Sequence, residues 1–241
     1  MSIFKILNNK VGKALHAYNM IDNKDKIAIG LSGGKDSLAL IWILTERLKW
    51  IPIKYELLAI YIDLGFENSF AEDLKKYAQK SGYEIIIEYA NYGILAHSKE
   101  NRENPCFLCS KLRKKRLFEL AVAHNCNKIA LGHHKDDIIE TLFLNIFYSG
   151  EISSMLPYQS LFNYKLAIIR PLAFTDEFII KKFTKTNNFP EFINSCPSAN
   201  NSKRHEVKAI LNNLYKTNKK IKGNIFSAMS RIKQDYLLKE S

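Results

Sequence analysis

Short apolar runs alternate along the chain with segments of helical periodicity. The apolar runs are rich in Ile, Leu, Val and Tyr and are bounded by turn or charged residues, which is typical of strands. These predicted strands cover residues 26–31, 55–62, 83–89, 128–131 and 165–169. The predicted helices cover residues 37–50, 69–80, 110–124, 136–148 and 176–187. Apolar strands that alternate with helices predict an α/β fold, in which a parallel five-stranded sheet carries helices on both faces.

The two ends of the chain are predicted to be helical additions to this sheet. From Ile3 to Tyr18, apolar residues recur at helical spacing with lysines among them, which predicts a short amphipathic helix rather than an export signal. From Asn201 to Ser241 the chain holds ten Lys or Arg against three Asp or Glu, again with helical spacing. We therefore expect an N-terminal helix over 1–25, a central domain over 26–190 and a basic helical extension over 191–241.

The charge of the chain indicates the kind of partner that it binds. The formal net charge is +12, so the surface attracts polyanions, and RNA, acidic proteins and membrane surfaces all remain candidates on charge alone. No apolar run approaches the ~20 residues of a membrane span. We expect a cytoplasmic protein without a membrane partner, in a compartment where thiols stay reduced. Four cysteines there indicate metal binding or catalysis more than disulfides.

A glycine-rich turn follows the first predicted strand. Ser32-Gly33-Gly34-Lys35-Asp36-Ser37 stands between the strand that ends at Leu31 and a helix that opens near Ser37. Glycines allow a close backbone approach, and the start of a helix presents unpaired N–H groups and a positive dipole end. Together with Lys35, this turn is predicted to bind phosphate. It is neither a Walker loop nor a Gly-x-Gly-x-x-Gly turn.

This turn resembles the pyrophosphate loop of the PP-loop ATPase superfamily. Members of that superfamily cleave ATP between the α and β phosphates and form an adenylated intermediate. The resemblance implies that residues 32–37 hold pyrophosphate, that Lys35 and Asp36 are catalytic, and that Mg²⁺ accompanies the phosphates. The cofactor-binding residues so implied are Ser32, Gly33, Gly34, Lys35, Asp36 and Ser37.

A second polar segment follows the predicted strand 128–131. Gly132-His133-His134-Lys135-Asp136-Asp137 opens a helix whose polar residues sit at the carboxyl end of a parallel strand, where open sheets bind ligands. The acidic pair is also compatible with simple helix capping, and the histidines with a metal site. The segment resembles a signature shared by tRNA 2-thiocytidine and tRNA-lysidine synthetases. That resemblance implies that Asp136 and Asp137 organise Mg²⁺ during adenylation, with His133 and the strand-end Asp63 at the nucleotide.

Three cysteines form the third candidate site. Cys106 and Cys109 make a Cys-x2-Cys pair, and Cys196 stands alone far downstream. A structural zinc site, a redox dithiol and an iron–sulfur cluster on three thiolates are all open interpretations of this set. The fourth cysteine, Cys126, is interpreted as a thiol of the core.

The order of these motifs resembles the tRNA 2-thiocytidine synthetase (TtcA) family over nearly the whole chain. The resemblance rests on the pyrophosphate loop, Cys-x2-Cys followed by Ser-x-Leu-Arg, the Gly-His-His-x-Asp-Asp segment, Arg170-Pro171-Leu172 and a late cysteine. It implies a [4Fe–4S] cluster on Cys106, Cys109 and Cys196, and ATP-dependent thiolation of a tRNA cytidine at position 32. Arg113 is then expected to steady the adenylate. A cysteine desulfurase or another donor would supply the sulfur.

Other functions share parts of this pattern. A tRNA-lysidine synthetase has the loop and the His-Asp helix but does not need the three cysteines. The tRNA 2-thiouridine synthetase of thermophiles carries terminal zinc modules that are missing here. A zinc-stabilised module that binds ATP and RNA without turnover, and an ammonia- or amino-acid-dependent ligase, are the remaining alternatives. The residues alone do not fix the modified nucleotide, the sulfur donor, the metal of the thiol site or whether the chain forms a homodimer.

Overall fold

The computed structural model describes residues 2–163, 165–192, 196–197 and 203–238. The chain divides into two compact units. Unit 1 comprises Met1–His134 and Leu156–Asn200, and unit 2 comprises Lys135–Met155 and Asn201–Ser241. Among the described residues, no helix is long and apolar enough to cross a membrane. The domain boundaries expected at 25/26 and 190/191 remain predictions.

Unit 1 is built on a six-stranded sheet whose order is β3-β2-β1-β4-β6-β5. The strands are β1 (Lys26–Leu31), β2 (Glu56–Asp63), β3 (Ile85–Tyr89), β4 (Lys128–Ala130), β5 (Tyr158–Leu161) and β6 (Leu166–Ile169). All neighbours pair in parallel except β5, which runs antiparallel to β6. The predicted α/β fold is therefore confirmed. The strand number was wrong by one, because the half-buried edge strand β5 was not among the predicted strands.

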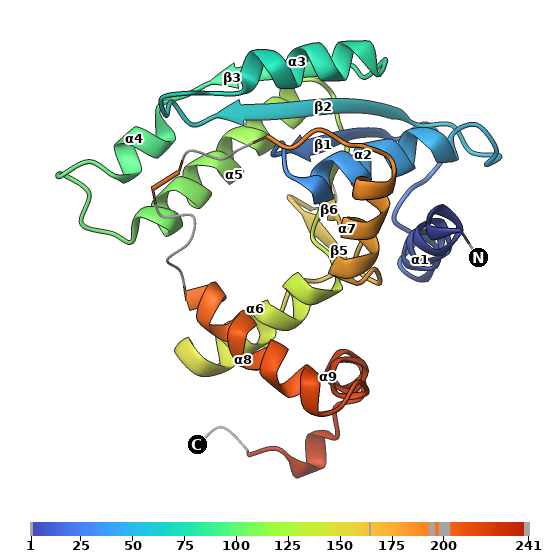
Figure 1. Cartoon of the computed structure of the whole chain (residues 1–241), viewed down its shortest axis with the longest axis vertical. Coiled ribbons are helices and arrows are strands. Elements are labelled where there is room, and N and C mark those ends of the chain that lie inside the picture. The colour runs from blue at the N-terminus through green and yellow to red at the C-terminus, as the bar shows by residue number, and fades with distance from the viewer. Residues whose placement is uncertain (1, 164, 193–195, 198–202, 239–241) are drawn as a thin grey trace. The chain divides into compact units, whose positions relative to one another are not determined.

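Helices cover both faces of this sheet (Figure 1). One face carries α1 (Ile3–Ala17), α2 (Lys35–Arg47) and α7 (Glu177–Thr186), and the other carries α5 (Pro105–Ala123). The shorter α3 (Ala71–Lys80) and α4 (Tyr92–Ala96) follow β2 and β3. The N-terminal amphipathic helix that the sequence predicted is present, with Leu7, Val11 and Ala14 on its buried face.

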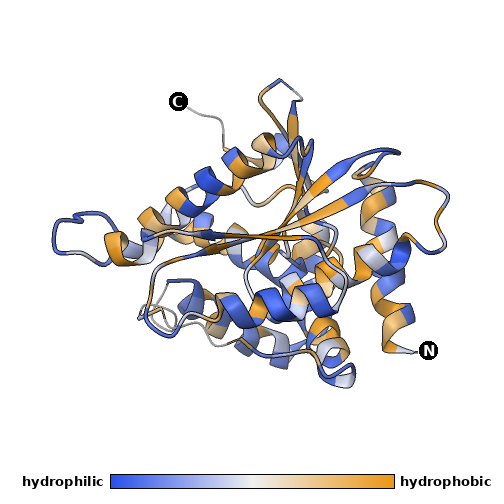
Figure 2. Ribbon diagram, turned by 90° about the horizontal axis from the view of Figure 1, so that it is seen from above, coloured by the Kyte–Doolittle hydropathy of each residue, from blue (hydrophilic) through white to orange (hydrophobic). Residues whose placement is uncertain are grey.

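The alternating direction of side chains along each strand explains why helices cover both faces of the sheet. Ile27 and Ile29 of β1 pack against the helices α1, α2 and α7, whereas Ala28 faces the opposite core with Leu117 and Leu120 of α5. Since successive residues of a strand point to opposite faces, an almost uninterrupted apolar strand requires cover on both sides. Figure 2 shows this pattern as predominantly hydrophobic strands between helices with mixed surfaces.

Unit 2 consists of helices. It contains α6 (Lys135–Tyr148), α8 (Lys203–Thr217), α9 (Ile221–Ala228) and the short 3₁₀ helix η1 (Gln234–Tyr236). Ile139 of α6 and Val207 and Leu211 of α8 form its buried core. The helical spacing of the basic C-terminal segment is confirmed by α8 and α9.

A buried ion pair closes the amino-terminal end of the sheet. The ammonium of Lys128, at the start of β4, lies 2.6 Å from Asp25 and 2.9 Å from Asp22. Asn127 donates a further hydrogen bond of 2.6 Å to Asp25. Burial by itself lowers the pKa of Lys128, but the two carboxylates raise it by more, so the ammonium stays charged.

Removing one member of this pair should destabilise the protein. We expect Asp25→Asn to lower the free energy of unfolding by about 3 kcal/mol, because a buried charge would lose its main partner. The exposed pair Lys26–Glu56, at 3.7 Å, provides the control. Glu56→Gln should change the same quantity by about 0–1 kcal/mol. Urea unfolding followed by circular dichroism measures both variants, and equal effects would contradict this account of the pair.

Candidate active site

The turn between β1 and α2 holds its shape through its own hydroxyl groups. The side chain of Ser37 is buried, accepts a hydrogen bond of 3.1 Å from the backbone N–H of Ser32 and donates one of 2.9 Å to the carbonyl of Gly34. The hydroxyls of Ser32 and Ser37 lie 3.1 Å apart. The backbone N–H of Gly34 donates to Ser32 Oγ. Ser37 therefore shapes the loop from within, since its hydroxyl is engaged there.

Gly33 allows the turn to lie under two aromatic rings. Its φ is +75°, a backbone conformation that residues other than glycine rarely adopt. A Cβ at this position would lie 2.5 Å from the ring of Phe70. Phe70 is stacked on Phe192, with ring centroids 5.2 Å apart. The next residue, Gly34, is the N-cap of α2 and provides no side-chain cap. The amino end of α2 thus presents backbone N–H groups and its positive dipole end to an anion.

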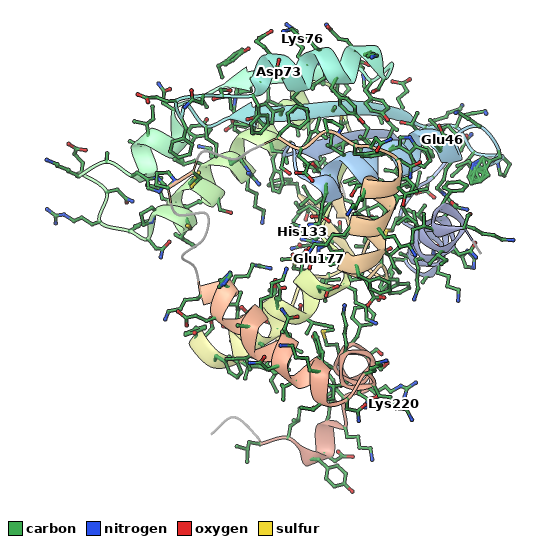
Figure 3. All side chains as sticks on the ribbon, in the orientation of Figure 1. Glu46, Asp73, Lys76, His133, Glu177 and Lys220 are labelled. Carbon is green, nitrogen blue, oxygen red and sulfur yellow. The ribbon has the colours of Figure 1, made fainter. Side chains whose placement is uncertain are left out.

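Three charged groups meet at the start of α2. The ammonium of Lys35 lies 3.1 Å from Asp36 and 3.3 Å from Glu177. Glu177, the first residue of α7, is labelled in Figure 3. Burial lowers the pKa of Lys35, but Asp36 and Glu177 together raise it above its ordinary value. Lys35 therefore keeps its positive charge at neutral pH. His134, which is buried, places Nε2 at 3.8 Å from Asp36 Oδ1.

Asp36 offers an oxygen that suits a cation. Its Oδ1 is buried and accepts no hydrogen bond from any described residue. A buried carboxylate oxygen without a donor is costly unless a ligand or water satisfies it. Oxygen ligands of this type are those that Mg²⁺ prefers. Asp36 is thus suited to be a ligand of Mg²⁺. Among the described residues, no three His, Cys, Asp or Glu side chains are placed as a group that could hold a metal ion.

A pocket opens beside the turn, at the carboxyl ends of β1 and β2. Its wall includes Ser32, Asp63 and Arg113, and its apolar part includes Tyr61 and Phe70. Asp63 is buried, and its carboxylate accepts hydrogen bonds from the backbone N–H of Gly65 at 2.7 Å and from the hydroxyl of Ser69. Asp63 therefore fixes the loop after β2 and lines the pocket at the same time.

Gly132 brings the loop after β4 against the start of α2. A Cβ on Gly132 would lie 3.0 Å from the backbone nitrogen of Ser37 and 3.1 Å from the carbonyl carbon of Asp36. Next to it, His133 Nδ1 accepts a hydrogen bond of 3.4 Å from Arg170 Nε–H. Arg170 is buried, and burial lowers its pKa to about 10, so it remains a cation at neutral pH.

Cys109 interacts with the two other candidate thiols and with Arg113. Cys106 and Cys109 lie one turn apart on α5, where Cys106 is exposed and Cys109 half-buried. Burial raises the pKa of Cys109, the neighbouring Arg113 lowers it, and Cys196 and Cys106 raise it further. Arg113, Cys196 and Cys106 are therefore electrostatic neighbours of Cys109, and Figure 1 shows the described stretch 196–197 beside α5.

This donor set suits a soft metal centre. Thiolates are the ligands of iron–sulfur clusters, and three of them leave one iron without a protein ligand. Among the described residues, the thiols are not placed as a three-ligand group. Cys126, in contrast, is buried in the core behind α5, which confirms the interpretation of a core thiol.

Asp136 and Asp137 belong to unit 2, where basic side chains of the C-terminal helices meet them. Lys222 donates to Asp136 at 2.6 Å, and Arg204 lies 3.6 Å from Asp137. Arg204 also lies 3.4 Å from the buried Glu140. The acidic start of α6 is therefore neutralised within unit 2 by α8 and α9.

Several residues of this site were missed by sequence reasoning. Glu177 and Ser69 were given no role, His134 was considered only as a possible metal ligand, and Arg170 and Gly132 appeared only as parts of motifs. Glu177 approaches Lys35 from 142 positions away in the sequence (177 minus 35), so no local pattern could reveal it. Gly132 carried a usable signal, because a glycine that ends a buried strand often marks a close backbone approach.

Comparison with known proteins gives one consistent family. The family model described as a PP-loop domain matches residues 5–216. A tRNA-cytidine(32) 2-sulfurtransferase of Geotalea uraniireducens (strain Rf4) is 36% identical over 239 residues, covering 98% of this chain and 95% of the relative. The tRNA-cytidine(32) 2-sulfurtransferase 1 of Francisella tularensis subsp. tularensis (strain WY96-3418) is 39% identical over 232 residues, with 95% and 86% covered.

Solved structures agree with this assignment. The U34-tRNA thiolase NcsA from Methanococcus maripaludis, solved with its [4Fe-4S] cluster, matches with a TM-score of 0.81 at 26% identity and covers 99% of this chain and 81% of that chain. An NH3-dependent NAD synthetase from Campylobacter jejuni shares the fold alone, with a TM-score of 0.55 at 16% identity. The chain belongs to the PP-loop domain family and, within it, to the tRNA-cytidine(32) 2-sulfurtransferases, enzymes that thiolate tRNA.

Proposed function

We propose that this enzyme uses ATP to adenylate the ring carbonyl oxygen of cytidine 32 in tRNA and then replaces that oxygen with sulfur. The curated relatives carry this substrate in their names, and the NcsA structure contains a [4Fe-4S] cluster. The physical need for ATP is clear, because a carbonyl oxygen is a poor leaving group until AMP is attached to it.

The observation that carries the proposal is the position of Arg113. Its side chain lines the pocket beside the Ser32 turn, and it is an electrostatic neighbour of Cys109, which also interacts with Cys196 and Cys106. A nucleotide-binding turn and a group of thiols that share one arginine are suited to two consecutive steps on one substrate. A lysidine synthetase or an ATP-binding module without turnover would not need this arrangement.

The first step is adenylation. The amino end of α2 and the charged Lys35 would hold the β and γ phosphates, and Ser32 to Ser37 would keep that turn in shape. The carbonyl oxygen attacks the α phosphate, the bond to the bridging oxygen breaks, and pyrophosphate leaves. Asp36 would hold Mg²⁺, which supplies charge neutralisation for the phosphates when bound. Asp63 and His133 would contact the nucleotide from the strand ends.

The second step is displacement. Sulfide forms a bond to the activated ring carbon, and the carbon–oxygen bond breaks so that AMP leaves with the former carbonyl oxygen. Arg113 would stabilise the negative charge of the departing AMP, since it lies between pocket and thiols. Cys106, Cys109 and Cys196 would hold a [4Fe–4S] cluster, which when bound offers an iron site for the incoming sulfur.

Unit 2 would bind the tRNA. We assign residues 191–241 as a basic extension whose lysines and arginines contact phosphates. Asp136 and Asp137 would help to position Mg²⁺ once RNA phosphates compete for Lys222 and Arg204, their present partners. We expect a cytoplasmic enzyme whose sulfur comes from a cysteine desulfurase or another donor.

Mass spectrometry of tRNA nucleosides tests the proposal directly. Purified enzyme, ATP, a sulfur source and unmodified tRNA should yield 2-thiocytidine together with equal amounts of AMP and pyrophosphate. Lysidine, or a thiolated uridine in place of cytidine, would identify a different member of the superfamily and overturn the assignment.

Alanine substitutions should distinguish the three candidate cluster thiols from the core thiol Cys126. We expect Cys106→Ala, Cys109→Ala and Cys196→Ala each to reduce 2-thiocytidine to the level without enzyme and to lower the iron content of anaerobically purified protein. The matched control is Cys126→Ala, which removes a buried thiol that faces only the core. It should lower stability while keeping iron and activity. Full activity of Cys106→Ala under anaerobic conditions would exclude a cluster from the reaction.

Alanine substitutions at two glycines separate the effect of backbone strain on stability from the effect of the turn's shape on ATP binding. Gly33 and Gly82 both have positive φ, at +75° and +73°, but a Cβ on Gly82 meets nothing within 4 Å. Each alanine substitution should cost about 1–2 kcal/mol of stability through its backbone conformation. Only Gly33→Ala should also weaken ATP binding, by about tenfold (~1.4 kcal/mol), because the ring of Phe70 must leave its stack.

Isothermal titration calorimetry with a non-hydrolysable ATP analogue measures this difference. Equal ATP affinities of the Gly33→Ala and Gly82→Ala proteins would show that the turn does not hold the nucleotide.

A further inference from the structure

An aromatic ring stands exposed between the two cysteines of α5. Phe107 is 60% exposed, although most large apolar side chains of unit 1 are buried. Its position is fixed, because the side chain of Asn104 accepts hydrogen bonds from the backbone N–H groups of Cys106 at 3.0 Å and Phe107 at 3.3 Å. Pro105 occupies the first helical position. The first turn of α5 therefore presents this ring to solvent on a rigid backbone.

A cationic side chain lies over the ring. The ammonium of Lys111, one turn further along α5, lies 5.9 Å from the centroid of the Phe107 ring. The same arrangement recurs on this helix with Lys114, 5.6 Å from the ring of Phe118. Residues 99–116 contain seven Lys or Arg against two Asp or Glu. Aromatic rings interleaved with cations are a surface suited to unpaired nucleotides, whose bases stack while their phosphates pair.

We propose that Phe107 stacks on an unpaired nucleobase of the tRNA beside the target cytidine, and that Lys111 binds the adjoining phosphate. The inference rests on the proposed function and names the surface through which the substrate reaches the thiols. Proteins recognise single-stranded RNA mainly by stacking splayed bases on aromatic side chains. Because Cys106 and Cys109 flank the ring in the sequence, a base held there brings its neighbour close to the thiols.

Charge favours RNA over a protein at this surface. A docking surface for a sulfur-donor protein would also use an exposed ring, but the excess of lysine and arginine around Phe107 complements phosphate. Lys115 and Arg116, on the same helix, pair with Glu119 at 3.9 and 3.1 Å, whereas Lys111 and Lys114 lie over rings. Lys111, whose ammonium lies over the Phe107 ring, is therefore in position for an incoming anion.

Two substitutions at one position separate stacking from apolar contact. Phe107→Leu keeps an apolar side chain without a ring, and Phe107→Trp keeps a larger ring. We expect Phe107→Leu to raise the Kd for unmodified tRNA about tenfold and Phe107→Trp to keep it near the original value. Lys111→Ala should weaken binding and reduce the slope of log K against log salt by about 1. The matched control is Phe178→Leu, on the first turn of α7, where Phe178 is 64% exposed.

Filter binding of labelled tRNA to the anaerobically purified enzyme, with iron measured in each sample, provides the data. Unchanged tRNA affinity in both Phe107→Leu and Lys111→Ala would overturn the inference. It would also be overturned if Phe107→Leu left tRNA affinity intact and slowed only sulfur transfer from a donor protein, with inorganic sulfide restoring the rate. If Phe107→Leu lowers the iron content, its tRNA affinity no longer reports on stacking alone. The tRNA affinity of Lys111→Ala then decides the result, because Lys111 lies outside the Cys-x2-Cys pair.

A failure of the proposed function would give a different result from a failure of the stacking inference. Wild-type enzyme that makes no 2-thiocytidine, but binds tRNA about tenfold more tightly than Phe107→Leu, would refute the thiolation and leave the stacking surface in place.

Discussion

The parallel pairing of β1 with β2 and β4 determines the rest of the site. Parallel strands end at the same edge of the sheet, so the turns after β1, β2 and β4 must meet there. The residues that arrive by this route are the glycine turn at Ser32–Ser37, the loop fixed by Asp63, and Gly132 with its two histidines. The meeting is close enough that Gly132 has no room for a side chain toward α2. Without that register, the polar residues of three separate segments would have no common location.

Helix α5 connects this edge to the thiols. It packs its apolar face on the sheet through Leu117 and Leu120, and it carries Arg113 into the pocket beside the Ser32 turn. Two turns earlier the same helix holds Cys106, with Cys109 between them. A rigid helix therefore sets the spacing between the group that would meet the phosphates and the groups that would hold the metal. Since Arg113 lowers the pKa of Cys109 while burial raises it, the two sites are also electrically coupled.

Much of this arrangement could be predicted from the sequence because its signals are local. The glycine turn, the apolar strands and the helical periodicity each lie within a few residues, and they were sufficient to predict the α/β fold and the turn between β1 and α2. The start of α5 was placed too late, at 110 instead of 105, although Asn104 followed by Pro105 is a typical helix start. Strand β5 was missed because half-buried residues such as Gln159 and Ser160 give an edge strand no clear alternation. Long-range partners such as Glu177 and Arg204 leave no local pattern at all.

In the proposed reaction, the ring oxygen of the substrate is first bonded to the α phosphate of ATP. It then leaves the ring as part of AMP when sulfur takes its place. The most direct measurement uses tRNA that carries ¹⁸O at the C2 carbonyl of cytidine 32, incubated with enzyme, ATP and sulfide. Mass spectrometry of the released nucleotide should then find one ¹⁸O atom in each AMP formed together with 2-thiocytidine. Unlabelled AMP, with the ¹⁸O recovered in water or retained in the tRNA, would contradict the account.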